Sequence, residues 1–141
     1  GGFAVPIREG YAAEIYIVSS GELMSLYAAN NIAKGVCRFA ARGAVKLGGI
    51  IGNGRDVARE KELLEAFAAR LGTKLIAYIP RSAAVHEAEI HRQTLIAYAP
   101  DSAQAKVYEE LAAAIEGNKN LVIPKPMAFE ELEDLVESYG N

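Results

Sequence analysis

Short apolar runs alternate with longer amphipathic segments along this chain of 141 residues, and this alternation constrains the fold more than any other feature. Three runs rich in apolar and β-branched residues predict buried strands, over residues 15–18, 45–51 and 75–79. Helical periodicity predicts five helices, over residues 22–41, 57–71, 82–92, 102–115 and 129–139. Strands that alternate with helices form βαβ units, so we expect an α/β fold with a doubly wound, mostly parallel sheet.

Local signals mark where several of these elements begin and end. Ser19 and Glu22 have the spacing of a capping box, which predicts the start of the first helix. Arg42-Gly43 is expected to end that helix, and Gly72 is expected to end the second. Residues 121–123 are expected to be extended, and residues 124–126, Pro-Lys-Pro, form a stiff linker.

Composition excludes several classes of protein. The chain carries 15 Lys and Arg against 18 Asp and Glu, a net charge of −3, which argues against a general nucleic-acid binder. A single cysteine excludes an internal disulfide and any four-cysteine metal or cluster site built by this chain alone. We find no signal peptide and no apolar run of about 18 residues, so we expect a cytoplasmic protein without a membrane partner.

The carboxyl ends of the predicted strands are the expected ligand site, because ligands of parallel α/β sheets bind there. These ends read Ser19-Ser20-Gly21, Gly52-Asn53-Gly54 and Pro80-Arg81-Ser82. A guanidinium beside a helix N-terminus, as at Arg81, suits an anionic or nucleotide ligand. An ordinary helix cap with a solvated arginine explains the same residues equally well.

The glycine-rich segment over residues 48–54 matches neither the dinucleotide fingerprint nor the phosphate-binding loop, since its G-x-G pair comes last and no Gly-Lys-Ser/Thr follows. Gly48 and Gly49 are best explained by a strand against which a helix packs closely and which leaves by a tight turn. Gly52 and Gly54 leave two alternatives open: close approach of the backbone to a ligand, or a plain turn.

Two further candidates for metal or nucleophilic chemistry are weak. His86 and His91 are five residues apart, roughly 140° around a helix, so their side chains diverge and do not form a zinc-protease motif. Cys37 lies inside a predicted helix and is interpreted as a small hydrophobic residue. We therefore assign no catalytic and no metal-ligating residue to this chain.

The whole chain resembles the nitrogenase iron protein family. The most specific segments are Gly-Gly-Phe-Ala at residues 1–4 and Tyr-Ala-Ala-Asn-Asn at residues 27–31. The similarity continues through residues 5–9, 14–24, 47–53, 71–73, 79–81, 122–126 and 132–134.

The resemblance implies a homodimeric, MgATP-driven electron donor of the P-loop ATPase fold. In this family a 4Fe-4S cluster is bridged between two subunits by two cysteines from each, and electrons pass to a nitrogenase or nitrogenase-like catalytic component. One cluster cysteine would lie directly before Gly1, and the other cysteine, the P-loop and both switch regions further upstream. Residues 1–141 are thus expected to be the C-terminal portion of a single ATPase domain, inactive when isolated.

The resemblance also implies roles for particular residues. Arg8 and Arg38 would occupy a face that docks the catalytic component, with Arg38 in place of a family lysine. The residues expected to hold the base of the nucleotide are Asn53, Pro80, Arg81, Val85, Glu89, Gln104 and Tyr108.

Several departures from the family pattern bear on these roles. Gly52 and Gly54 flank Asn53 where the family usually has Cys and Ser. Ser82 replaces an Asp, His86 a Gln, and Tyr11 a docking Lys. The catalytic component served therefore stays open between nitrogenase and a nitrogenase-like system, and the alternative class is a non-redox P-loop ATPase that positions or partitions cargo.

Overall fold

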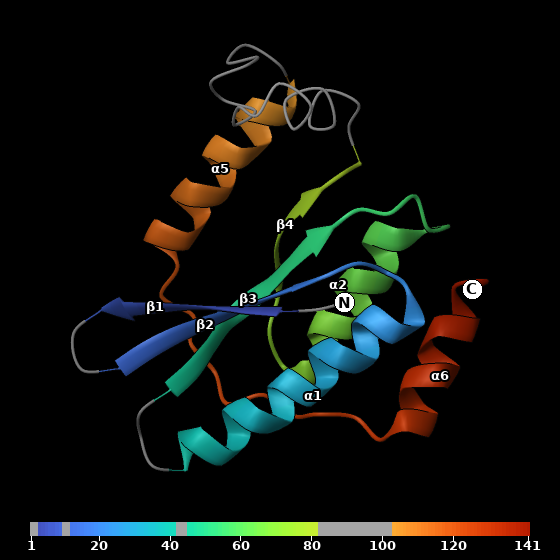
Figure 1. The fold of residues 1–141 in the computed structure, drawn as a ribbon, viewed down its shortest axis with the longest axis horizontal. Helices are drawn as coiled ribbons and strands as arrows, with labels where there is room; N and C mark the ends of the chain where they lie inside the picture. The colour runs from blue at the N-terminus through green and yellow to red at the C-terminus, as the bar shows by residue number, and fades with distance from the viewer. Residues whose placement is uncertain (1–2, 10–11, 42–44, 82–102) are drawn as a thin grey trace.

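The computed structural model describes the backbone of residues 3–9, 12–41, 45–81 and 103–141. These residues form a four-stranded sheet in the order β1-β2-β3-β4 (Figure 1). Strands β2 (Ala12–Ser19), β3 (Val45–Asn53) and β4 (Leu75–Ile79) are parallel, and β1 (Phe3–Glu9) pairs antiparallel with β2. The predicted α/β fold with a mostly parallel sheet is confirmed.

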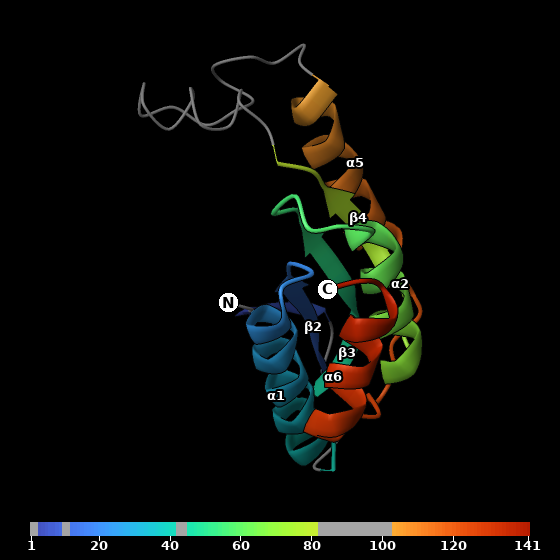
Figure 2. The same ribbon diagram turned by 90° about the vertical axis from the view of Figure 1, so that its right-hand side faces the viewer.

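In the described part of the chain, three helices cover one face of the sheet and one helix covers the other (Figures 1 and 2). Helices α1 (Leu23–Ala40), α2 (Glu60–Leu71) and α6 (Phe129–Ser138) lie together on the first face, and α5 (Ala103–Gly117) packs on the second beside β4. The predicted helix over residues 82–92, with His86 and His91, lies outside the described residues, as does the predicted stop at residues 42–43.

The main core lies between the sheet and helices α1, α2 and α6. Apolar residues spaced by three or four along each helix pack against apolar residues of β2 and β3. This packing removes both sets of side chains from water. Its fully buried members include Ile17, Leu26, Leu47, Ile50, Leu63, Leu64, Phe67, Leu71 and Leu132. Helical periodicity thus identified the buried faces of α2 and α6, but in α1 it pointed to Tyr27 and Phe39, which are exposed, whereas small residues such as Ala29 and Ala33 are buried.

A second, smaller core lies on the face covered by α5. It contains Tyr16, Ile51 and Ile79, with Tyr108 and other α5 side chains packed against them. Tyr16 lies over Gly48, where an added Cβ would come within 2.5 Å of the tyrosine Cζ. Gly48 is therefore a close-packing residue, but the atoms that approach it belong to the neighbouring strand β2 and not, as the sequence had suggested, to a helix.

One buried side chain ties α1 to the segment that precedes α6. The Asn30 Nδ2 donates to the Met127 carbonyl oxygen at 2.7 Å, and the Met127 N–H donates to Asn30 Oδ1 at 2.9 Å. Nearby, the Cys37 thiol donates to the Pro124 carbonyl oxygen at 2.9 Å, so this half-buried cysteine is a packing residue with one polar contact. Both contacts join residues far apart in the sequence.

Three local predictions were wrong in detail. The N-cap of α1 is Glu22 without a side-chain cap, because Ser19 Oγ instead donates to the Ser20 carbonyl oxygen and contacts Ser25 Oγ at 3.0 Å. Helix α2 begins at Glu60 rather than at residue 57, because Arg59 is left-handed with φ 51°. Strand β1 was not predicted; it contains Pro6 and lies at the edge of the sheet, where a proline is tolerated.

The extended segment and the second helix end were predicted correctly. Val122 forms an antiparallel bridge with Leu47, with N···O distances of 2.8 and 2.9 Å. Gly72 ends α2 with φ 86°, a conformation that favours glycine. Within the part of the chain that is described, none of the helices combines the length and apolar character needed to cross a membrane.

Candidate functional site

The carboxyl ends of β3 and β4 bring three of the predicted site residues together. Asn53 pairs with Ile79 in the sheet, and the Gly54 N–H donates to the Ile79 carbonyl oxygen at 2.7 Å. Pro80 and Arg81 follow directly, so they lie beside Asn53, and all three side chains are exposed. A parallel sheet places these ends at one edge, as the sequence predicted.

A polar cavity of about 340 Å³ opens at the same edge, between the ends of β2 and β3. Arg55 and Glu22 form an exposed ion pair across it, with Nε and Oε1 3.6 Å apart. Its lining consists of Val18, Ser19, Ser20, Glu22, Asn53 and Arg55. Hydroxyl, amide, carboxylate and guanidinium groups therefore surround a space that a polar small molecule can enter.

Behind this edge lies Glu60, a buried carboxylate that the sequence analysis did not identify. Its Oε2 accepts from the Gly21 N–H at 2.9 Å, and its two oxygens accept from the Arg55 N–H at 3.0 and 3.1 Å. The Tyr78 hydroxyl donates to Oε1 at 2.7 Å. Partial burial, followed by this hydrogen bond, raises the pKa of Tyr78 to about 12.

The loop over residues 54–59, which follows Asn53, has an unusual backbone. Asp56 and Arg59 have φ values of 60° and 51°, a left-handed conformation that costs roughly 1–2 kcal/mol for a residue with a side chain. Arg81 lies 3.9 Å from Asp56 in an exposed ion pair. Arg59 stacks on Tyr139, and its hydrogen bond to Glu62 raises the pKa of the guanidinium.

Glycines at this edge are explained by protein packing. A Cβ at Gly54 would lie 2.9 Å from the Tyr78 hydroxyl and 3.0 Å from the Pro80 Cα. A Cβ at Gly52 would lie 2.8 Å from Tyr78 Cδ1. The sequence left two alternatives open for Gly52 and Gly54, close approach of the backbone to a ligand or a plain turn. Other atoms do lie close to both glycines, but these atoms belong to the protein chain.

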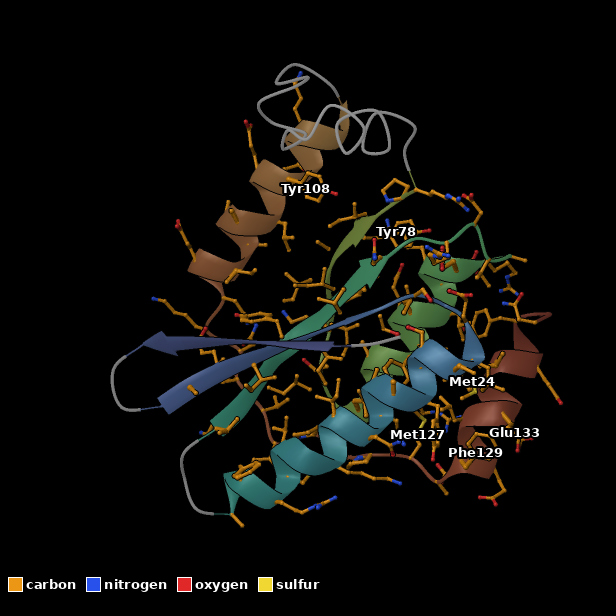
Figure 3. The ribbon with its side chains drawn as sticks, in the orientation of Figure 1. Met24, Tyr78, Tyr108, Met127, Phe129 and Glu133 are labelled. Atoms are coloured by element: carbon orange, nitrogen blue, oxygen red, sulfur yellow. The ribbon has the colours of Figure 1, made fainter. Side chains whose placement is uncertain are left out.

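The remaining predicted base-binding residues belong to the segments that follow β4. Tyr108, labelled on α5 in Figure 3, is half-buried and packs against the second core, on the face of the sheet opposite to α2. Gln104 lies in the first turn of α5. Val85 and Glu89 lie outside the described residues.

The two predicted docking residues lie at the other end of the sheet. Arg8 is in β1 opposite Ala13, which is near the start of β2. Arg38 is exposed in the last turn of α1, a helix that runs back from the carboxyl end of β2 (Figure 1). Both therefore lie near the amino ends of the parallel strands, away from Asn53.

The residues of this chain do not fit a 4Fe-4S cluster on their own. Such a cluster needs four cysteine thiolates, and the sequence contains Cys37 alone, whose thiol is engaged with a backbone carbonyl. No group of three or more His, Cys, Asp or Glu side chains in the described ranges could hold a metal ion. The polar edge around Asn53, by contrast, suits an organic ligand with donor and acceptor groups.

Comparison with known proteins defines the class first. This chain is an α/β protein, and its fold is similar to that of the cell division ATPase MinD of Pyrococcus furiosus, with a TM-score of 0.50 and 21% identity. The match covers 68% of this chain and 39% of MinD, so the chain spans about two fifths of that protein's length. Residues 1–141 in full match the 4Fe-4S iron sulfur cluster binding proteins of the NifH/frxC family, and the chain belongs to this family.

Proposed function

We propose that this chain is the C-terminal portion of an ATP-dependent electron-transfer component that serves a nitrogenase or nitrogenase-like catalytic partner. The observation that carries the proposal is the family match over all 141 residues. When bound to the complete protein, the 4Fe-4S cluster would supply the electron. Its cysteines, the P-loop and the switch regions would lie in the part of the subunit that precedes Gly1.

The contribution of this chain would be to bind the base of ATP at the carboxyl edge of the sheet. The Asn53 amide can both donate to and accept from adenine, which presents both kinds of group on one edge. Pro80 and Arg81 lie beside it, and the exposed Arg81 guanidinium is 3.9 Å from the exposed Asp56 carboxylate. Val85, Glu89, Gln104 and Tyr108 would complete the base site from the segments that follow β4.

A separate face would dock the catalytic component. Arg8 and Arg38 lie at the end of the sheet opposite to Asn53, so nucleotide and partner would bind at opposite ends of the strands. Cationic side chains there would pair with carboxylates of the partner. The functional unit would be a homodimer, as in the family.

The test uses the complete protein, purified without oxygen. We expect MgATP binding by calorimetry, an electron paramagnetic resonance signal from the reduced cluster, and electron transfer to a catalytic component. Asn53→Ala is expected to weaken MgATP binding about tenfold, whereas Asn31→Ala, an exposed asparagine on α1, leaves it unchanged. MgATP binding without any iron–sulfur signal would favour the non-redox ATPase instead.

A further inference from the structure

Glu60 joins the ends of all three parallel strands through one carboxylate. Gly21 follows the end of β2, Arg55 follows the end of β3, and Tyr78 is the penultimate residue of β4. Only 3% of Glu60 is exposed, so these bonds form where water competes weakly. Because the acceptor is charged, they are stronger than hydrogen bonds between neutral groups.

The surrounding chain is shaped to admit this carboxylate. A Cβ at Gly21 would lie 2.9 Å from Glu60 Cγ, so a larger residue at this position would displace the Glu60 side chain. Gly54 likewise leaves room for the Tyr78 hydroxyl, because a Cβ at this position would lie 2.9 Å from it. Two glycines, from two different strand ends, thus accommodate Glu60 and its tyrosine partner.

The same carboxylate holds a strained loop. Asp56 and Arg59 both adopt left-handed backbone angles between Asn53 and Glu60. Strain of this kind persists only when other contacts hold the backbone in place. The two hydrogen bonds from the Arg55 N–H to Glu60 fix the chain two residues after Asn53.

We propose that Glu60 is a positioning residue of the nucleotide site, which sets the place of Asn53 relative to Pro80 by holding Arg55 and Tyr78 together. The inference rests on the proposed function, in which these residues hold adenine. Glu60 itself is buried behind the cavity and would not touch the nucleotide. Its effect should therefore fall on recognition of the base and leave binding of the phosphates unchanged.

The test compares three probes in the complete protein: MgATP, MgGTP and magnesium tripolyphosphate. Glu60→Ala is expected to raise the Kd for MgATP about tenfold and to reduce the preference for ATP over GTP by a similar factor. The Kd for tripolyphosphate should change less than about twofold. Glu60→Gln should restore most of the ATP affinity, because its amide oxygen can accept from Gly21 and Arg55 while its NH₂ donates to the Tyr78 oxygen.

Glu65→Ala is the matched control, since Glu65 is an exposed glutamate on the same helix. Equal MgATP affinity in the two alanine variants would overturn the proposal, and so would an equal loss for ATP and tripolyphosphate. If Glu60→Ala does not fold, Tyr78→Phe replaces it: about threefold weaker ATP binding supports the proposal, and unchanged binding overturns it.

The two proposals fail in different ways. A complete protein that does not bind MgATP, or an Asn53→Ala variant that binds it normally, overturns the proposed function and the role of Glu60 with it. A protein in which Asn53→Ala weakens binding but neither Glu60→Ala nor Tyr78→Phe does so retains the nucleotide site and overturns only the positioning role.

Discussion

Replacing Asn30 by alanine should loosen the attachment of α6 to α1. Asn30 is 2% exposed, and its amide makes two hydrogen bonds to the backbone of Met127, 97 residues later in the sequence. Alanine removes the amide and leaves the Met127 N–H and carbonyl without these partners. The asparagine pair at residues 30 and 31 that marks the family resemblance thus contains one residue with a clear structural role.

The size of the effect follows from these two bonds. Leaving a buried polar group without a partner costs about 1–3 kcal/mol, so the two groups of Met127 together cost about 3 kcal/mol if the segment relaxes in part. That free energy corresponds to about a hundredfold change in a local opening equilibrium. Asn30→Asp should destabilise the attachment of α6 at least as much as Asn30→Ala, because a carboxylate oxygen would then face the Met127 carbonyl oxygen.

Hydrogen exchange read by mass spectrometry is the appropriate assay, because it reports opening of one segment. Peptides that cover residues 124–138 should exchange about a hundredfold faster in Asn30→Ala than in the unmodified protein. Asn31→Ala is the control, since Asn31 is exposed on the same helix and its loss should change stability by less than about 0.5 kcal/mol. Equal exchange in the two variants would refute the reasoning.

Two further predictions concern the sheet. Gly48→Ala should lower the free energy of unfolding by about 1–3 kcal/mol because its Cβ would meet Tyr16, whereas Gly35→Ala in α1, with no atom within 4 Å of the added Cβ, should raise it by about 0.5–1 kcal/mol. Urea denaturation of both variants checks this pair, and two equal midpoints would contradict it. The raised pKa of Tyr78, about 12 when folded against about 10 when unfolded, keeps its stabilising contribution intact below about pH 10 and removes it as the pH rises toward 12. Stability measured across this range should fall less steeply in Tyr78→Phe, and an identical fall in both proteins would rule out a contribution from this phenol.

Much of the fold followed from patterns that depend only on nearby residues. The runs at residues 15–18, 45–51 and 75–79 became β2, β3 and β4, since a strand buried on both faces must be apolar throughout. The C-terminal helix was placed within one residue, because its amphipathic period is clear and α6 buries that stripe. Asn53 and Arg81 were assigned to one edge from topology alone.

Features that depend on distant contacts could not be predicted in this way. The start of α2 moved to Glu60 because the left-handed Arg59 is held in place by tertiary contacts, including the stack on Tyr139 near the end of the chain. The Ser19 hydroxyl had the spacing of a helix cap, yet it bonds to Ser20 and Ser25 instead. In both cases a favourable local pattern was overridden by geometry set elsewhere.

The sequence by itself determined the fold class, the order of the elements from β2 to β4 and the family, because periodicity and family-specific segments are properties of the chain read residue by residue. Only the tertiary structure revealed that Glu60 gathers Gly21, Arg55 and Tyr78, and that Asn30 reaches Met127. The physical reason is that a buried polar group must find its partners within about 3 Å in space, and no spacing along the chain records which strand end will supply them.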